Sequence, residues 1–343
     1  MGTPTSRQFT NSRVALSTLV ASAIAAFTLT PGAANAAENG FGFYLLGSKE
    51  AVAGIIPPPG LYFQNDIYYF SGSASPGKDI PLDGRLTAGL KAKNWVDAPT
   101  LLWSTPVQIL GGNLALSATV PIGGPRIGVA ATLTGPGGGT IATNLHDSIF
   151  TVGDPLLGAS IAWHAGDFHW NVGVLVNTPI GDYRNGALAN LAFDHWGEDF
   201  NAAFTWLNPR TGLEISSAIG ITVNQLHSAT QYKTGNEFHY EGAVIQHFPN
   251  GFAVGLIGYY YNQISGDSGA GAVLGPFEGR VSALGGYAGY TFKVEERPIT
   301  ASIKVLREFD AQNRLSDGVA AYFTIAMPIS TMPAPSAPPK ALR

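Results

Sequence analysis

Ten titratable side chains fall in the polar phase of segments that otherwise alternate between polar and apolar residues. Because a β-strand sends successive side chains to opposite faces, these residues are expected on the wet face of a sheet. Channels select solutes by the charge and hydrogen-bonding groups of their lining, so these residues are candidates for lining a lumen. They carry both signs of charge, which fits a solvated or mutually paired network as well as a specific ligand site. The ten are Arg85, Lys91, Lys93, His169, Glu214, His239, Glu241, His247, Lys304 and Glu308.

No residue pattern predicts catalysis, a cofactor or a metal centre. Ser and His residues are scattered, and HSA at 227–229 lacks an assignable orienting acid. Asp267 lies in a glycine-rich stretch at 266–272, but calcium takes six to eight oxygens, so a flexible outer loop is expected there. FDHWGEDF at 193–200 is a denser polar group, expected in an exposed loop at the rim. The chain has no cysteine and therefore no disulfide or thiolate chemistry.

The segments that must position these residues are strands of unusual length. In DFHWNVGVLVNT, residues 167–178, apolar side chains such as Trp170 and Val172 alternate with His169 and Asn171. The same alternation recurs at 85–93, 213–224 and 299–308. Such segments run for about 9 to 13 residues, which suits a tilted membrane crossing better than a soluble sheet.

The composition indicates that the apolar faces of these strands contact lipid rather than a protein core. Charged residues make up 12% of the chain, about half the usual share, whereas glycine (43 residues) and aromatic residues (11%) are abundant. No continuous apolar run of about 18 residues occurs after the first forty residues, which excludes ordinary helical spans. A membrane protein of this kind must be a closed barrel. Aromatic residues near strand ends, such as Phe168, Tyr259, Tyr261 and Tyr290, are expected in interfacial girdles.

Turn signals indicate an all-β, transmembrane antiparallel barrel of about twelve strands, with short periplasmic turns and long outer loops. Splitting residues 84–109 at Pro99 or Pro106 would give fourteen strands instead. Short turns are expected at 110–113, 165–167, 208–212, 249–251 and 293–298, and long loops at 122–155, 179–198, 225–236 and 265–279.

The chain ends differ in character from the predicted barrel, which covers 61–327. Residues 1–36 have the pattern of a signal peptide: two arginines, an apolar run at 14–29 and a small-residue site before Ala37. An uncleaved anchor helix is the alternative. Residues 328–343 are a Pro-rich tail expected to be disordered. After cleavage, 17 basic and 23 acidic residues remain, a formal net charge of −6, which argues against nucleic-acid binding.

Several stretches resemble the outer-membrane transporter family named for the meta-pathway of phenol degradation, which is distantly similar to the long-chain fatty acid transporters. The resemblance implies a barrel and a route for phenolic and other hydrophobic aromatic compounds. One departure is that barrels of this type often end on an aromatic residue, whereas this chain continues past Met327. The stretches are PPPGLYFQNDIYYFSG at 57–72, GDPLLGASIAW at 153–163, NTPIGDY at 177–183, the long segment 234–281 and REFDAQNR at 307–314.

Residues 37–60 precede the first predicted strand and end in a rigid proline run. The similarity to fatty acid transporters implies that they fold into the lumen as a plug, with Phe43, Tyr44, Leu45 and Ile55 forming an apolar constriction. A periplasmic arm is the alternative.

The expected function is passive or facilitated uptake of small hydrophobic, aromatic compounds across the outer membrane of a Gram-negative bacterium. The expected partners are outer-membrane lipid, lipopolysaccharide, the barrel-assembly machinery and the substrate. A general polar-solute porin and a structural or binding β-protein of the cell surface are the alternatives.

Overall fold

The computed structural model describes residues 42–82, 85–134, 140–272, 276 and 278–331, although side chains at 74–82, 85–89, 131–134, 140–143 and 316 are outside the description. The predicted signal peptide and the part of the tail from 332 onward lie outside the described residues. Within the described part, no helix is long and apolar enough to cross a membrane.

Fifteen strands account for most of the described chain. The first eight are β1 (Gly60–Leu82), β2 (Arg85–Ile109), β3 (Gly112–Thr119), β4 (Ile122–Thr134), β5 (Thr140–Ser148), β6 (Thr151–Val152), β7 (Leu156–Ala165) and β8 (Phe168–Asn177). The others are β9 (Gly197–Leu207), β10 (Leu213–Asn224), β11 (Glu237–His247), β12 (Phe252–Gln263), β13 (Arg280–Val294), β14 (Arg297–Gln312) and β15 (Ser316–Thr331).

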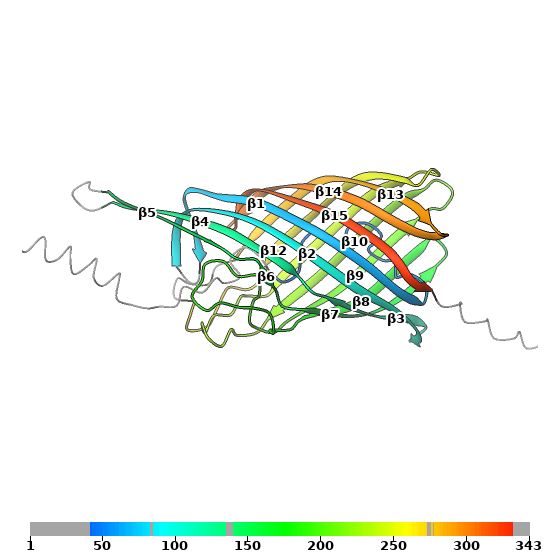
Figure 1. Cartoon of the computed structure of the whole chain (residues 1–343), viewed down its shortest axis with the longest axis horizontal. Helices are drawn as coiled ribbons and strands as arrows, with labels where there is room; N and C mark the ends of the chain where they lie inside the picture. The colour runs from blue at the N-terminus through cyan, green and yellow to red at the C-terminus, as the bar shows by residue number, and fades with distance from the viewer. Residues whose placement is uncertain (1–41, 83–84, 135–139, 273–275, 277, 332–343) are drawn as a thin grey trace, which may run out of the picture.

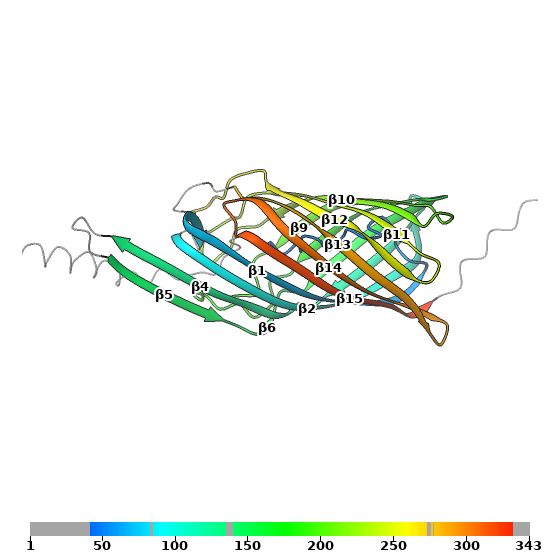
Figure 2. The same ribbon diagram turned by 90° about the horizontal axis from the view of Figure 1, so that it is seen from above.

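Twelve of these strands form a closed antiparallel barrel. Figures 1 and 2 show this barrel from two directions. The hydrogen-bonded order runs β1-β15-β14-β13-β12-β11-β10-β9-β8-β7-β3-β2, and pairing of β1 with β2 closes the ring. The predicted twelve-strand barrel is therefore confirmed. The fourteen-strand alternative is wrong because β2 is one strand of 25 residues, whose register shifts between Ser104 and Gln108, around Pro106, without ending it.

The ends of the barrel differ as predicted. Short turns, such as the one at Gly166 between β7 and β8, gather at the end where β15 finishes, and long loops lie at the other end. Short turns on the periplasmic side and long loops outside are the rule for outer-membrane barrels. The last strand reaches Thr331, four residues beyond the predicted limit at Met327.

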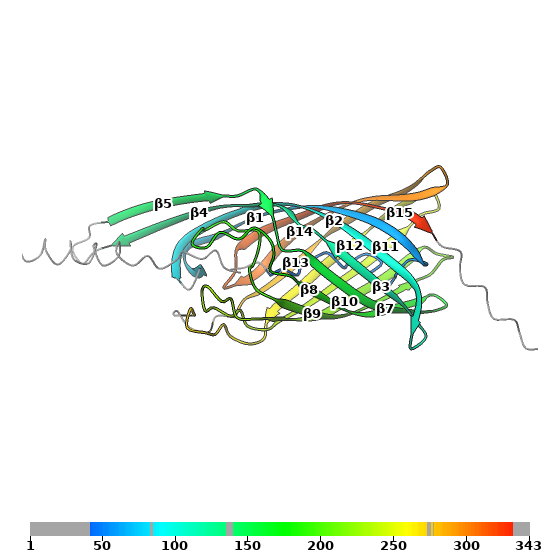
Figure 3. The ribbon, with the colours of Figure 1, turned by 60° about the horizontal axis from the view of Figure 1, so that its bottom comes forward.

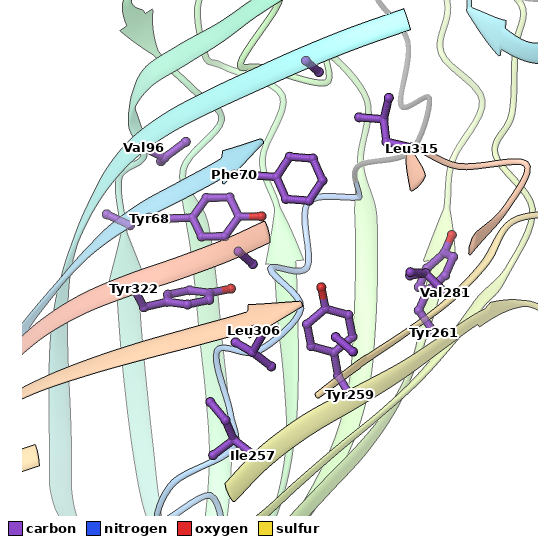
Figure 4. Packing of buried hydrophobic residues seen from close by; sticks show 14 of the residues in the cluster. Tyr68, Phe70, Val96, Ile257, Tyr259, Tyr261, Val281, Leu306, Leu315 and Tyr322 are labelled. Atoms are coloured by element: carbon purple, nitrogen blue, oxygen red, sulfur yellow. The ribbon is translucent and has the colours of Figure 1, made fainter. Parts of the chain in front are cut away.

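Alternation along the strands separates an apolar exterior from a mixed interior. Outward-facing residues such as Val172, Ile219 and Ile303 are 46%, 47% and 52% exposed. Other parts of the protein leave these side chains uncovered, so in a membrane they contact lipid. A cluster of buried aromatic and aliphatic residues faces inward, and Figure 4 shows Tyr68 and Tyr322 projecting from the wall into the barrel. The oily face of the strand at 167–178 therefore faces outward.

The predicted aromatic girdle is correct only in part. Phe168 and Tyr290 face outward, at 48% and 42% exposure. Tyr259 and Tyr261 instead face the lumen, where each is buried and donates its hydroxyl proton to a carboxylate. Position near a strand end does not by itself reveal which face an aromatic side chain occupies.

The stretch expected as a long loop at 122–155 contains β4, β5 and β6. The outer half of β2 pairs with β4, and β5 pairs with β4, so the sheet extends beyond the barrel as a ribbon (Figure 3). The ribbon joins the barrel wall at Gly123 and Gly124 of β4, whose φ angles are 148° and 155°. A Cβ on Gly123 would lie 2.1 Å from the Trp95 carbonyl oxygen, so only glycine fits this junction.

Candidate functional site

The N-terminal segment, Gly42–Pro59, lies inside the barrel. It starts beside the outer ends of the strands, where the Gly42 backbone is near Glu237, and it leads to β1 at the periplasmic end. Its course through the interior is visible in Figure 4 behind the inward-facing tyrosines. Of the two placements considered for this segment, the described residues from 42 onward therefore occupy the lumen.

One carboxylate holds the first half of the segment. Glu241 is fully buried and accepts hydrogen bonds from the Tyr44 hydroxyl at 2.9 Å, the Gly47 amide at 3.0 Å and the Lys49 amide at 2.7 Å. Across the lumen, Lys304 donates to the Gly47 carbonyl oxygen. A buried carboxylate with three donors is well satisfied, so this contact fixes the backbone in place.

A second set of wall residues holds the other half. Glu214 accepts the Val52 amide proton at 2.7 Å, and Thr205 Oγ1 accepts the Gly54 amide proton at 2.9 Å. Asn171 donates its side-chain amide to the Ala53 carbonyl oxygen at 2.9 Å. A Cβ on Gly54 would approach the barrel backbone at Thr205 to 2.5 Å, which shows how closely the two chains pass.

Between this segment and the wall lies a cavity of about 430 Å³. The four predicted constriction residues all line it, with Phe43 and Tyr44 buried and Leu45 and Ile55 half-buried. Apolar wall residues from the inward phase of β2 complete this side: Leu90, Ala92, Val96 and Ala98. The cavity is therefore mainly apolar, although polar residues such as Lys49, Asp66 and Asn94 also line it.

Asp66 and Asn94 both line the cavity, but their side chains differ in hydrogen bonding. Asp66 accepts hydrogen bonds from Gln64 Nε2 at 2.7 Å and from the Thr324 hydroxyl at 2.5 Å, so it is satisfied. Asn94 Oδ1 is buried and has no hydrogen-bond partner among the residues that the structure describes. An acceptor left unpaired in an apolar cavity favours a ligand that carries a donor, such as a hydroxyl group.

The outer loop between β8 and β9 covers the cavity, and Asp154 organises it. Asp154 accepts the amide protons of Phe193 at 2.7 Å and Gly181 at 2.8 Å, and Asn177 donates to it at 3.1 Å. Two of the stretches quoted for the family resemblance, at 153–163 and 177–183, therefore meet here. Leu191 and Phe193 from this loop line the cavity.

Two histidines lie beneath the outer loops. His195 is 3% exposed and His227 is 4% exposed, and their ring centroids are 6.3 Å apart. Burial lowers the pKa of both imidazoles below its usual value, although Asp194, 3.6 Å from His227, opposes this effect. Both rings are therefore held in the neutral form at neutral pH.

The predicted lumen residues divide into three groups. Seven lie in the inward phase of their strands, namely His169, Glu214, His239, Glu241, His247, Lys304 and Glu308. Lys91 and Lys93 are exposed on the outward face, so their assignment to the lumen is corrected. The apolar Leu90 and Ala92 take the inward phase there because β2 continues beyond the barrel, where the outer face meets water. The side chain of Arg85 lies outside the described residues.

Several buried polar residues of the lumen were not predicted from the sequence. Asp199 is fully buried in β9 and lies 2.7 Å from His239 Nε2, although it was expected in an exposed rim loop. The Tyr44 ring stacks on His239 at 3.7 Å. The alternation in GEDFNAAFTWL, residues 197–207, places Asp199, Asn201 and Thr205 in one phase, which was the available signal. Asp267 lies in an outer loop, where its carboxylate accepts a hydrogen bond from the Tyr232 hydroxyl at 2.5 Å.

Comparison with known proteins identifies the family. The sequence pattern of the family described as "Putative MetA-pathway of phenol degradation" matches residues 72–325. The chain belongs to this family. No curated protein matches the chain in sequence. The resemblance noted in the sequence is thereby confirmed.

One solved structure supports the fold, and a second is reported for comparison. The chain is similar to the crystal structure of the COG4313 outer membrane channel from Pseudomonas putida F1, with 13% identity, coverage of 83% of this chain and 99% of that chain, and a TM-score of 0.60. The CymD monoaromatic hydrocarbon channel matches at 8% identity over 81% of this chain and 90% of that chain, with a TM-score of 0.38. The fold is that of an outer-membrane channel, and its apolar exterior belongs in the outer membrane.

Proposed function

We propose that this family member is an outer-membrane channel for small hydrophobic, aromatic compounds, which it takes up without energy coupling. The cavity between the N-terminal segment and the wall carries the proposal. Its volume of about 430 Å³ lies in the range typical of small-ligand sites, and its lining is mainly apolar. The description of the family, which names phenol degradation, supports an aromatic substrate class.

The expected binding free energy of such a compound favours passage through the cavity rather than tight retention in it. A small aromatic compound that loses about 200 Å² of apolar surface to the cavity gains about 5 kcal/mol. Association costs at least about 4 kcal/mol in lost translational and rotational freedom. The small difference means that the compound is captured weakly and can leave again.

The lumen segment argues against a general polar-solute porin. Its backbone is bonded to both Glu241 and Glu214 on the wall, so it fills space that a hydrated pore would need. The same proposal includes export through a cleaved signal peptide and insertion by the barrel-assembly machinery. It also assigns the protein a transport role rather than a catalytic one.

The test is initial uptake of labelled phenol and toluene at low concentration. Cells lacking the protein are compared with cells that carry the native chain, an Ala92→Trp variant or an Ala288→Trp variant. Ala92 is buried and lines the cavity, whereas Ala288 is exposed on the outer face. We expect Ala92→Trp to lower aromatic uptake several-fold, because the indole fills the cavity, and Ala288→Trp to leave it unchanged.

A small sugar provides the control solute. If sugar uptake depends on the protein while aromatic uptake does not, the porin alternative replaces the proposal. If neither solute depends on it, a channel function is wrong.

A further inference from the structure

The ribbon that extends beyond the barrel carries a cluster of cations on its outward face. Lys93 of β2 lies directly opposite Arg126 of β4, and Lys91, two residues along β2, shares their face. Directly paired strand residues have Cβ atoms about 5 Å apart, and residues two apart on one strand are about 7 Å apart. Three positive charges are therefore held within a short distance of one another by the hydrogen-bond register of the sheet.

The cluster lines a groove of about 780 Å³. All three side chains are exposed, and His146 of β5, opposite Gly128, adds a ring nitrogen to the same face. Ile127 and Val129 also border the groove, but they belong to the opposite phase of β4, and Val129 is buried in the inward-facing cluster. The side chains on the outward face here are thus mainly cationic.

These cations lack carboxylate partners among the described residues, where none of the ion pairs includes Lys91, Lys93 or Arg126. Asp97, on the same face of β2, is four residues from Lys93 and accepts a hydrogen bond from Asn65 at 2.7 Å. Asp147 borders the groove but accepts the Ala189 amide proton and lies 3.6 Å from Arg184. Like charges on adjacent strand positions destabilise a sheet, so an anion from outside the chain is the natural complement.

The position of the cluster indicates where that anion resides. Just below it on the same face, Tyr69 and Trp95 pack with ring centroids 5.0 Å apart, and Trp95 is 56% exposed. Aromatic residues of this kind mark the membrane interface at headgroup level. Because the ribbon is at the long-loop end, this is the outer interface, and the cations stand at the height of the outer-leaflet headgroups.

We propose that the outward face of β2 and β4 binds the phosphate groups of lipopolysaccharide through Lys91, Lys93 and Arg126. The guanidinium of Arg126 presents paired N–H donors that match phosphate oxygens, and the two ammonium groups supply point charges beside it. The site faces away from the lumen. It is independent of the proposed transport function.

The test is binding of purified lipid A to the folded full-length barrel in detergent, followed by native mass spectrometry. The variant Lys91→Gln/Lys93→Gln/Arg126→Gln is compared with Arg210→Gln/Lys293→Gln/Arg297→Gln. The second set removes the same charge from exposed cations at the periplasmic end. Three cations near an anionic surface account for a change of about a hundred-fold in affinity, so we expect that loss in the first variant and little change in the second.

Two further arms separate the possible sources of phosphate. Lipid A without its phosphate groups should bind the native protein and the first variant equally, and inorganic phosphate at millimolar concentration should not displace lipid A. The Lys91→Gln/Lys93→Gln/Arg126→Gln variant should keep the unheated electrophoretic mobility of the native protein, which excludes misfolding as the cause, and Lys91→Arg/Lys93→Arg/Arg126→Lys should retain binding. Equal binding of lipid A by all variants, or competition by inorganic phosphate alone, would overturn the proposal.

Discussion

At the scale of single residues, the buried carboxylates of the lumen have different roles. Glu241 and Glu308 face the interior of the same barrel and are both buried. Glu241 binds the N-terminal segment, including two of its backbone amides, whereas Glu308 accepts a hydrogen bond from Tyr259 on the wall at 2.6 Å. Removal of one carboxylate should therefore loosen the segment, and removal of the other should affect only the wall.

This difference predicts the behaviour of Glu241→Ala. The change leaves the Tyr44 hydroxyl and two backbone amides without an acceptor, at a cost of about 1–3 kcal/mol for each buried group that stays unpaired. We expect higher ion conductance in planar bilayers, together with faster proteolysis of the N-terminal segment. Glu308→Ala is the matched control and should do neither. Equal conductance for both variants would show that Glu241 does not hold the segment.

At the scale of elements, the outer loop at 178–196 is held over the lumen by Asp154 and by packing around His195. Because burial lowers the pKa of His195 and His227, the folded loop favours their neutral forms. A group with a depressed imidazole pKa contributes stability that is complete above the ordinary value of 6.5 and is lost as the pH falls below it. Acid should therefore loosen this loop.

Hydrogen exchange of the loop amides at pH 7.5 and pH 5 tests this expectation. After correction for intrinsic rates, we expect faster exchange at pH 5 in the native protein, because two buried imidazoles acquire charge. The variant His195→Gln/His227→Gln should lose this pH dependence. If its pH dependence equals that of the native protein, other groups are responsible.

At the scale of the whole molecule, stability depends on a closed ladder of backbone hydrogen bonds inside a shell of lipid. Every barrel strand pairs on both sides, so the barrel has no free edge in the membrane. The free-energy cost of a charged side chain on the apolar exterior should therefore depend on its depth, because a charge at mid-membrane is far from any polar surroundings.

Two substitutions on β14 measure this dependence. Val305 is near the middle of the strand and Phe309 is nearer its outer end, and both face outward at 49% and 53% exposure. We expect Val305→Arg to lower the free energy of unfolding by about 2–4 kcal/mol and Phe309→Arg by about 0–1 kcal/mol. Denaturant unfolding in liposomes provides the measurement. Equal losses would place the membrane midplane elsewhere along β14.

The sequence by itself determined the fold class and the face of most strands, and it narrowed the strand count to about twelve or fourteen. Alternation such as that of His169 and Asn171 with Trp170 and Val172 follows from backbone geometry, and the low charge content identifies lipid as the outer solvent. Both signals are local, so they can be read without knowing which strands pair.

The tertiary structure alone decided what fills the lumen and where β2 leaves the membrane. Lys91 and Lys93 were assigned to the wrong face because a strand that continues into water is free to place charges outside. The course of the N-terminal segment rests on contacts such as that between Lys304 and Gly47, which are 257 positions apart. No local pattern encodes such a contact, because it exists only once the barrel has closed around the segment.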